Sequence, residues 1–107
     1  MLTTDELRDL GPAAYGELVR ATVGTRPVFV SFDIDFLDPA FAPGTGTPEV
    51  GGFSTAEALA FVRALRGVQL VGCDVVEVSP PYDGPGMVTA LAAATVLYEL
   101  LSLRALR

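Results

Sequence analysis

Three aspartates lie close together in the segment SFDIDFLDP, residues 31–39, at positions 33, 35 and 38. If the preceding strand runs through Asp33 and Asp35, the two side chains project from the same face, because they are two residues apart. Two carboxylates held side by side must share a proton or a cation, and no basic residue lies nearby in the sequence. Carboxylate oxygens favour hard divalent ions such as Mg²⁺ or Mn²⁺. Asp33 and Asp35 are therefore candidate metal ligands.

The same pair has a plainer interpretation, in which one aspartate caps the loop backbone as an Asx turn and the other is solvated. Asp38 precedes Pro39, and this dipeptide favours a turn over a binding role. Asp83 lies in a Pro/Gly turn and is interpreted in the same way. A D-x-D pattern alone leaves metal binding and local capping open.

Two further acids lie in the run VQLVGCDVVEV, residues 68–78. Glu77 comes next to the C-terminal end of this predicted strand, level with the aspartate pair if the two strands are neighbours. Regular pleating places Asp74 and Glu77 on opposite faces. Asp74 lies deeper, and we expect it to be a structural hydrogen-bond acceptor. For Glu77 taken alone, a carboxylate that emerges into solvent is the favoured interpretation.

Capping signals and hydrophobic periodicity predict the elements that carry these residues. Thr3-x-x-Glu6 and Ser54-x-x-Glu57 are capping boxes that begin helices, and Gly11-Pro12 interrupts the first of them. The predicted strands span residues 27–35 and 68–78, and a last helix spans about 87–103. This order predicts an α/β layered fold with parallel strands and right-handed crossovers.

Two parallel strands that are apolar on both faces need neighbouring strands and two helix layers to cover them. The chain supplies only these two strong strands, and an isolated pair is too small a sheet to stand alone. We therefore expect the chain to be part of a larger domain or to pair with another chain.

Composition excludes several classes of function. The 107 residues are enough for one domain at most, and the net charge of -6 argues against nucleic acid as a partner. The chain contains no histidine, so a Ser-His-Asp or Cys-His mechanism cannot be built from it. One cysteine excludes a disulfide framework and fits a reducing compartment.

The ends of the chain suggest a cytoplasmic protein without a membrane partner. The N-terminus, MLTTDELRDL, is acidic and polar and so resembles neither a signal nor a transit peptide. The longest apolar segment, Met87 to Leu103, contains polar residues and is interpreted as a buried helix.

The segment SFDIDFLDPAFAPGTGTPEVGG resembles the C-terminal signature of the ureohydrolases, the arginase/agmatinase family. The part DPAFAPGTGTPEVGG is especially similar to agmatinases. The later segments DVVEVSPPYD and TALAAATVLYELL also resemble that family, so the likeness covers nearly the whole chain.

This resemblance implies the C-terminal part of a three-layer α/β/α fold with a site for two Mn²⁺ ions that hydrolyses a guanidino group and releases urea. Asp33 and Asp35 would be metal ligands, Glu77 would pair with the substrate's guanidinium, and Thr47 would line that pocket. A guanidinium stays protonated, so its recognition calls for a carboxylate. The family's habit also implies a homo-oligomer, a trimer or a hexamer.

The family's other ligands lie in Gly-Gly-Asp-His and Asp-Ala-His-x-Asp motifs on earlier strands, and both motifs are absent here. The resemblance therefore describes residues 1–107 as the C-terminal part of one ureohydrolase domain whose N-terminal part is absent, and as inactive alone. Agmatine is the expected substrate, with arginine and guanidinobutyrate open. The alternatives are a non-catalytic remnant or partner subunit that packs on a full-length relative, and, ranked lower, a D-x-D metal–nucleotide clamp, since no phosphate-cradling glycine loop with a nearby lysine is present.

Overall fold

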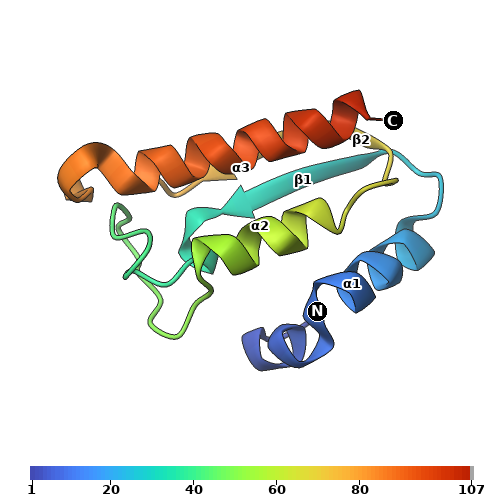
Figure 1. Cartoon of the computed structure of the whole chain (residues 1–107), viewed down its shortest axis with the longest axis horizontal. Coiled ribbons are helices and arrows are strands. Elements are labelled where there is room, and N and C mark those ends of the chain that lie inside the picture. The colour runs from blue at the N-terminus through green and yellow to red at the C-terminus, as the bar shows by residue number, and fades with distance from the viewer. Residues whose placement is uncertain (107) are drawn as a thin grey trace.

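The computed structural model describes residues 1–106 and contains three long helices and two strands (Figure 1). Short 3₁₀ helices follow each strand. In chain order the elements are α1 (Thr4–Val23), β1 (Val28–Asp33), a 3₁₀ helix (Ile34–Phe36), α2 (Thr55–Arg63), β2 (Leu70–Val76), two more 3₁₀ helices (Pro80–Tyr82 and Pro85–Met87) and α3 (Val88–Ala105).

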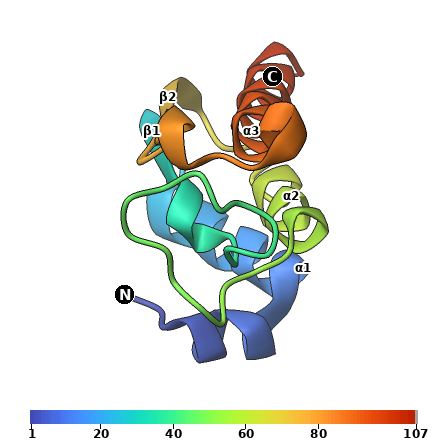
Figure 2. The ribbon, with the colours of Figure 1, turned by 90° about the vertical axis from the view of Figure 1, so that its left-hand side faces the viewer.

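The two strands pair in parallel, as the sequence predicted, and Asp33 at the end of β1 lies opposite Val76 at the end of β2. Figure 2 shows β1 and β2 on one side of the molecule with α2 and α3 packed together against one face of the sheet. The opposite face is open, since Phe29, Ser31 and Asp33 of β1 are all exposed there. The predicted α/β fold is confirmed, and the described residues supply one helix layer over two strands.

The core lies between the sheet and the two helices that cover it. Apolar residues of β1, the segment after it, α2, β2 and α3 form this core, and the members with no measurable exposure are Ile34, Ala58, Val96 and Leu100. A second group of rings joins α1 to α2 and to the loop before it: Phe36 stacks on Phe53, and Phe61 meets Tyr15 edge-on. Burial of these apolar side chains supplies the main favourable contribution to the free energy of folding.

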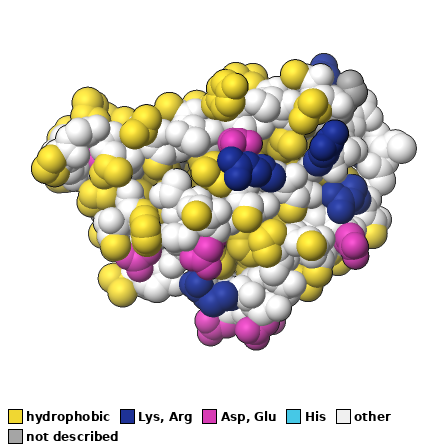
Figure 3. Space-filling model, in the orientation of Figure 1, with side chains coloured by type: hydrophobic (Ala, Val, Ile, Leu, Met, Phe, Trp, Pro, Cys, Tyr) yellow, Lys and Arg dark blue, Asp and Glu magenta, His cyan; other side chains and the backbone are white. Residues whose placement is uncertain are grey.

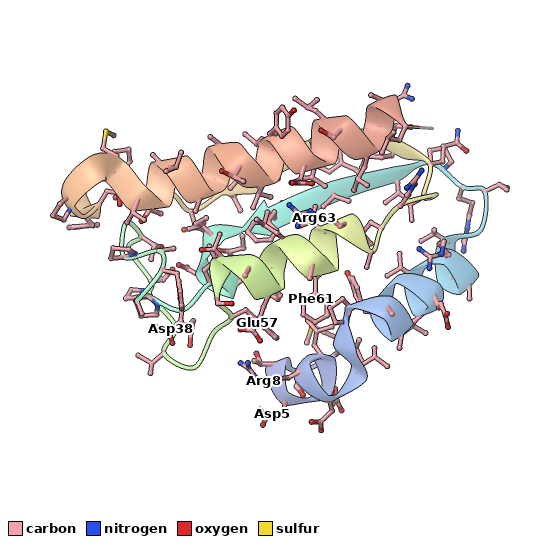
Figure 4. All side chains as sticks on the ribbon, in the orientation of Figure 1. Asp5, Arg8, Asp38, Glu57, Phe61 and Arg63 are labelled. Atoms are coloured by element: carbon pink, nitrogen blue, oxygen red, sulfur yellow. The ribbon has the colours of Figure 1, made fainter. Side chains whose placement is uncertain are left out.

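The first helical span is broken at Gly11, as the sequence predicted from Gly11-Pro12. Gly11 at the kink has φ of 80°, a conformation that glycine adopts at little cost, and Pro12 then restarts the helix. Two arginines fasten α1 to α2. Arg8 contacts the N-terminal end of α2 through Glu57 (Figure 4). Arg20 donates to the carbonyls of Ala64 and Arg66, just beyond the C-terminal end of α2.

Both capping boxes are present as predicted. Thr3 and Glu6 exchange side-chain and backbone hydrogen bonds at the start of α1, and Ser54 and Glu57 do the same at the start of α2. These reciprocal bonds satisfy N–H groups that a helix start leaves without partners. The local sequence therefore sets where each helix begins.

Both strands are shorter than the sequence predicted. β1 ends at Asp33 because the side chain of Asp33 accepts the N–H of Asp35 and begins a 3₁₀ helix at Ile34. β2 ends at Val76 because the next residue, Glu77, has φ of 70° and leaves the extended conformation. The expectation that Asp33 and Asp35 share one face of a strand is therefore wrong: Asp35 belongs to the 3₁₀ helix.

Large apolar side chains lie on the surface as well as in the core. Figure 3 shows them scattered over α3 and below it, and the outward-facing members of that helix include Leu91, Tyr98 and Leu101. The segment from Pro85 to Ala105 is long and apolar enough to cross a membrane by length and composition alone. Its inner side, with Thr89, Ala92 and Val96, is buried against the rest of the domain, as in the core helix that the sequence predicted.

Candidate metal centre

The candidate site lies where the two parallel strands end. Because Asp33 is opposite Val76, Glu77 follows the strand end at the same level as the aspartates. This confirms the prediction that Glu77 lies at the same end of the sheet as Asp33. Ligand sites of open α/β sheets lie outside the carboxyl ends of the strands, and the structure brings Asp33, Asp35 and Glu77 to that edge.

Each aspartate uses one carboxylate oxygen to hold the local backbone or loop. Oδ1 of Asp33 accepts the N–H of Asp35 at 2.8 Å, and this is the Asx-type cap that the sequence left as an alternative. Oδ2 of Asp35 accepts the hydroxyl of Thr47 at 2.6 Å. A carboxylate that caps the backbone through one oxygen keeps its second oxygen for another ligand, so the cap at Asp33 does not exclude a metal.

Oδ1 of Asp35 is buried and has no hydrogen-bond partner among residues 1–106. Leaving a buried polar atom without a partner costs about 1–3 kcal/mol, and more when the group is charged. A bound ion can satisfy a buried atom of this kind. A hard divalent ion therefore fits this carboxylate by its chemistry.

The number of ligands is the limiting feature. Across residues 1–106, no group of three or more His, Cys, Asp or Glu side chains is arranged to hold a metal ion. A hard divalent ion takes about six oxygen ligands, so two aspartates supply a minor share of the coordination. The two carboxylates are ligands of the right chemical type for a hard metal ion, but they are too few to complete its coordination.

Thr47 lies on a loop that is fastened at several points. Its N–H donates to Oγ1 of the buried Thr45 at 3.3 Å. One residue before Thr45, the N–H of Gly44 donates to Oγ1 of Thr89, and the carbonyl of Gly44 accepts the N–H of Ser79 at 2.7 Å. The loop therefore joins α3 to the segment that follows Glu77, and this places Thr47 beside Asp35.

Glu77 is exposed and has a left-handed backbone conformation, which is uncommon for a residue with a side chain. Conformations of this kind cluster at functional sites, where the surrounding structure maintains them. The positive φ also breaks the regular pleat of the strand. The prediction that Asp74 and Glu77 lie on opposite faces of the sheet assumed regular pleating, so it does not apply to Glu77. This conformation is a signal for function that residue spacing did not reveal.

Asp74 has the structural role that was predicted for it. Its Oδ1 accepts the hydroxyl of Ser31 at 2.6 Å, and Ser31 is its directly paired residue on β1. The bond joins the two strands on the open face of the sheet. Asp74 therefore stabilises the strand pair that ends at the candidate site.

Asp38 is a turn residue, as predicted. Its Oδ1 accepts the N–H of Ala40 and its Oδ2 accepts the N–H of Gly51 at 2.9 Å, so it closes the loop on itself (Figure 4). These backbone donors hold the pKa of the Asp38 carboxyl below its ordinary value. Gly52 lies against this turn so tightly that a Cβ there would be 2.7 Å from the nitrogen of Asp38.

Asp83 does more than the turn predicted for it, because its carboxylate caps the last helix. Its oxygens accept the N–H groups of Gly84, Thr89 and Ala90 at 2.8 to 3.0 Å. Burial by itself raises the pKa of Asp83, but the hydrogen bonds from Thr89, Ala90 and Gly84 outweigh it and lower the pKa to about 2. The sequence signal for this cap was the acid ahead of an apolar helix without another capping residue.

A shallow cleft of about 540 Å³ borders Asp35 on the side of the N-terminus. Its walls come from residues 3–5, from Asp35 and Phe36, and from the loop at residues 49–52. Asp5 and Glu49 add two further carboxylates to its lining. The electrostatics of the cleft therefore favour a cation over an anion.

Comparison with known proteins identifies relatives along nearly the whole chain. The Arginase family model matches residues 1–102. The chain is 56% identical over 101 residues to a guanidinopropionase of Pseudomonas aeruginosa, covering 94% of this chain and 31% of that protein. It is 49% identical over 105 residues to an agmatinase of Photorhabdus laumondii, covering 98% of this chain and 34% of that protein.

A solved structure shares the fold. Proclavaminate amidino hydrolase from Streptomyces clavuligerus superimposes with a TM-score of 0.92 at 49% identity, covering 97% of this chain and 34% of that one. The chain therefore spans about a third of the length of these relatives. The sequence predicts an incomplete sheet, and the ligand set in the structure is also incomplete. Both agree with a chain that spans about a third of its relatives' length.

Proposed function

Because this chain belongs to the arginase family, we propose that it is the C-terminal part of a single ureohydrolase domain, with agmatine as its expected substrate. The observation that carries the proposal is the buried, unpartnered Oδ1 of Asp35, next to Asp33 and at the level of Glu77. The named relatives include a guanidinopropionase, an agmatinase and an amidino hydrolase. The names guanidinopropionase and amidino hydrolase point to a guanidino or amidino group, and the reaction that we propose for this chain is hydrolysis of a guanidino compound with release of urea.

In this proposal Asp33 and Asp35 hold a Mn²⁺ pair together with ligands from the rest of the domain. When bound, the metal pair would supply an activated water as the nucleophile. The chain's own contribution is to fix the two carboxylates: Asp33 through the N–H of Asp35, and Asp35 through the hydroxyl of Thr47. These hydrogen bonds hold both carboxylates at the ends of the strands before a cation binds.

Glu77 recognises the guanidinium of the substrate. Its carboxylate can accept two parallel N–H bonds from a planar guanidinium, which gives orientation as well as affinity. The conformation of Glu77, held by its surroundings at φ of 70°, supports this assignment. Thr47 belongs to the same pocket wall.

The alternative is a non-catalytic chain that packs on a full-length relative. The open face of the sheet, with Phe29 60% exposed, would be covered in either case. The carboxylate arrangement favours the enzymatic proposal, because a packing role does not need an acid with a buried, unpartnered oxygen.

The proposal is tested in a chimera, in which this chain replaces the matching third of the Pseudomonas aeruginosa guanidinopropionase. We expect Mn²⁺-dependent urea release, measured with agmatine, 3-guanidinopropionate, 4-guanidinobutyrate and arginine in parallel. Asp35→Asn should lower kcat by at least about a hundredfold, since loss of a preorganised charge costs several kcal/mol in the transition state.

Asp9→Asn is the matched control, because Asp9 is exposed on α1 and makes no described side-chain contact. Full urea release by the Asp35→Asn chimera would refute the metal assignment. An inactive chimera that is folded and binds Mn²⁺ would favour the non-catalytic alternative.

A further inference from the structure

Thr47 makes a contact that the pocket-wall role does not require. Its hydroxyl donates to Oδ2 of Asp35, and the 2.6 Å between the two oxygens is typical of a strong bond to a carboxylate. The other oxygen of Asp35 is the buried one without a partner among the described residues. One oxygen is thus held by the protein and the other is left for a ligand.

We infer that Thr47 is a positioning residue, whose hydroxyl orients Asp35 so that Oδ1 is the atom presented to a divalent cation. This inference rests on the proposed metal role of Asp35. Metal-ligating carboxylates are commonly held by a hydrogen bond outside the ligand set, and loss of that bond typically costs about 10- to 100-fold in metal affinity at a complete site.

The loop gives Thr47 the rigidity that positioning needs, although the residue itself is exposed. Its N–H is bonded to the hydroxyl of Thr45, which is 5% exposed. Gly44, next to Thr45, is bonded on both sides, to Thr89 and to Ser79. A hydroxyl on an anchored backbone can hold a carboxylate in one orientation. On a mobile loop, the entropy lost in ordering the loop would cancel the free energy gained from the hydrogen bond.

The role is also distinct from that of Asp33. Oδ1 of Asp33 is held by a backbone N–H, which no side-chain substitution removes. Asp35 depends on a side-chain hydroxyl, so a substitution at position 47 changes one ligand and leaves the other. Thr47→Val keeps the shape without the donor, and Thr47→Ser keeps the donor.

The experiment titrates MnCl₂ into the isotope-labelled 107-residue chain and follows paramagnetic broadening of backbone NMR signals. Signals of Asp33 and Asp35 report the candidate site, and those of the exposed Asp9 report binding to any surface carboxylate. We expect the signals of Asp33 and Asp35 to broaden first. In Thr47→Val the Mn²⁺ concentration for half-broadening at Asp35 should rise about three- to tenfold, and in Thr47→Ser it should stay within about twofold of the wild type.

Equal titrations for wild type and Thr47→Val, with the amide spectrum otherwise retained, would overturn the positioning role and leave the proposed function intact. Broadening of Asp33 and Asp35 no stronger than that of Asp9 in the wild type would overturn the metal role of Asp35 itself, and the inference with it. A Thr47→Ser chain that behaves like Thr47→Val would also overturn the inference, because serine retains the donor.

Discussion

The backbone N–H of Gly44 donates a hydrogen bond to Oγ1 of Thr89, with 2.8 Å between the two atoms, although the residues are 45 positions apart in the chain. Thr89 is fully buried, and its backbone N–H donates to the carboxylate of Asp83 at 2.9 Å. A Cβ at position 44 would come within 2.9 Å of the Thr89 hydroxyl. One buried threonine therefore joins the loop of the candidate site to the first turn of α3.

Thr89→Val tests this junction, because valine fills the same space without a hydrogen-bonding atom. The change leaves the N–H of Gly44 without its partner, so we expect a loss of about 1–3 kcal/mol of unfolding free energy. Urea denaturation measures it. Thr95→Val, on the same helix, is the matched control with an expected change below about 0.5 kcal/mol. A loss at Thr89 no larger than at Thr95 would contradict the role of the junction.

The low pKa of the Asp83 carboxyl predicts that the free energy of unfolding depends on pH in the acid range. Its pKa is about 2 in the folded chain, against 3.8 for an unperturbed aspartate, so the unfolded chain binds the proton more readily. The stabilising contribution is therefore complete above about pH 4 and is lost as the pH falls toward about 2. We expect the difference in melting temperature between wild type and Asp83→Asn to shrink over this range. An unchanged difference from about pH 5 to about pH 2 would rule out Asp83 as the source.

Much of the fold could be predicted from the sequence because local signals agree with the final structure. Both capping boxes, the parallel strand pair and the turn at Asp38 were inferred correctly. The strand ends could not be, because they depend on the side-chain cap at Asp33 and on the positive φ of Glu77, neither of which periodicity encodes.

The candidate site was predictable in its residue types and in the level of Glu77 at the ends of the strands. Asp33, Asp35 and Glu77 were identified from carboxylate chemistry and from resemblance. The bond between Thr47 and Asp35 joins residues that are 12 positions apart and not on one regular element. Contacts of this kind follow from tertiary packing, and no spacing rule anticipates them.

Glu77→Gly tests the strain at the candidate site. A residue with a side chain pays about 1 kcal/mol or more in the left-handed region, and glycine does not. We therefore expect this substitution to leave the unfolding free energy unchanged or slightly increased. Glu17→Gly in the middle of α1 is the contrast, with an expected loss of about 1 kcal/mol. Equal losses at both positions would show that Glu77 is not strained.

Arg8 holds the N-terminal half of α1 over the loop before α2. Its guanidinium lies 4.4 Å from the ring centre of Phe53 and donates to the carbonyl of Gly51 at 3.1 Å (Figure 4). Lysine keeps the charge but not the planar group, so Arg8→Lys should cost about 0.5–1 kcal/mol. Arg104→Lys, at an exposed position near the end of α3, should change nothing measurable in the same denaturation assay. If both variants unfold like the wild type, the planar contact contributes nothing to stability.

The central claim is that this chain supplies Asp33, Asp35 and Glu77 to a metal-dependent guanidino site that it does not complete alone. The most direct test compares urea release from agmatine, with Mn²⁺ supplied, by the purified 107-residue chain and by the guanidinopropionase chimera at equal concentration. We predict turnover by the chimera and none above background by the isolated chain, because two carboxylates cannot supply the ligands that a hard divalent ion requires. Robust Mn²⁺-dependent urea release by the isolated chain would contradict the account.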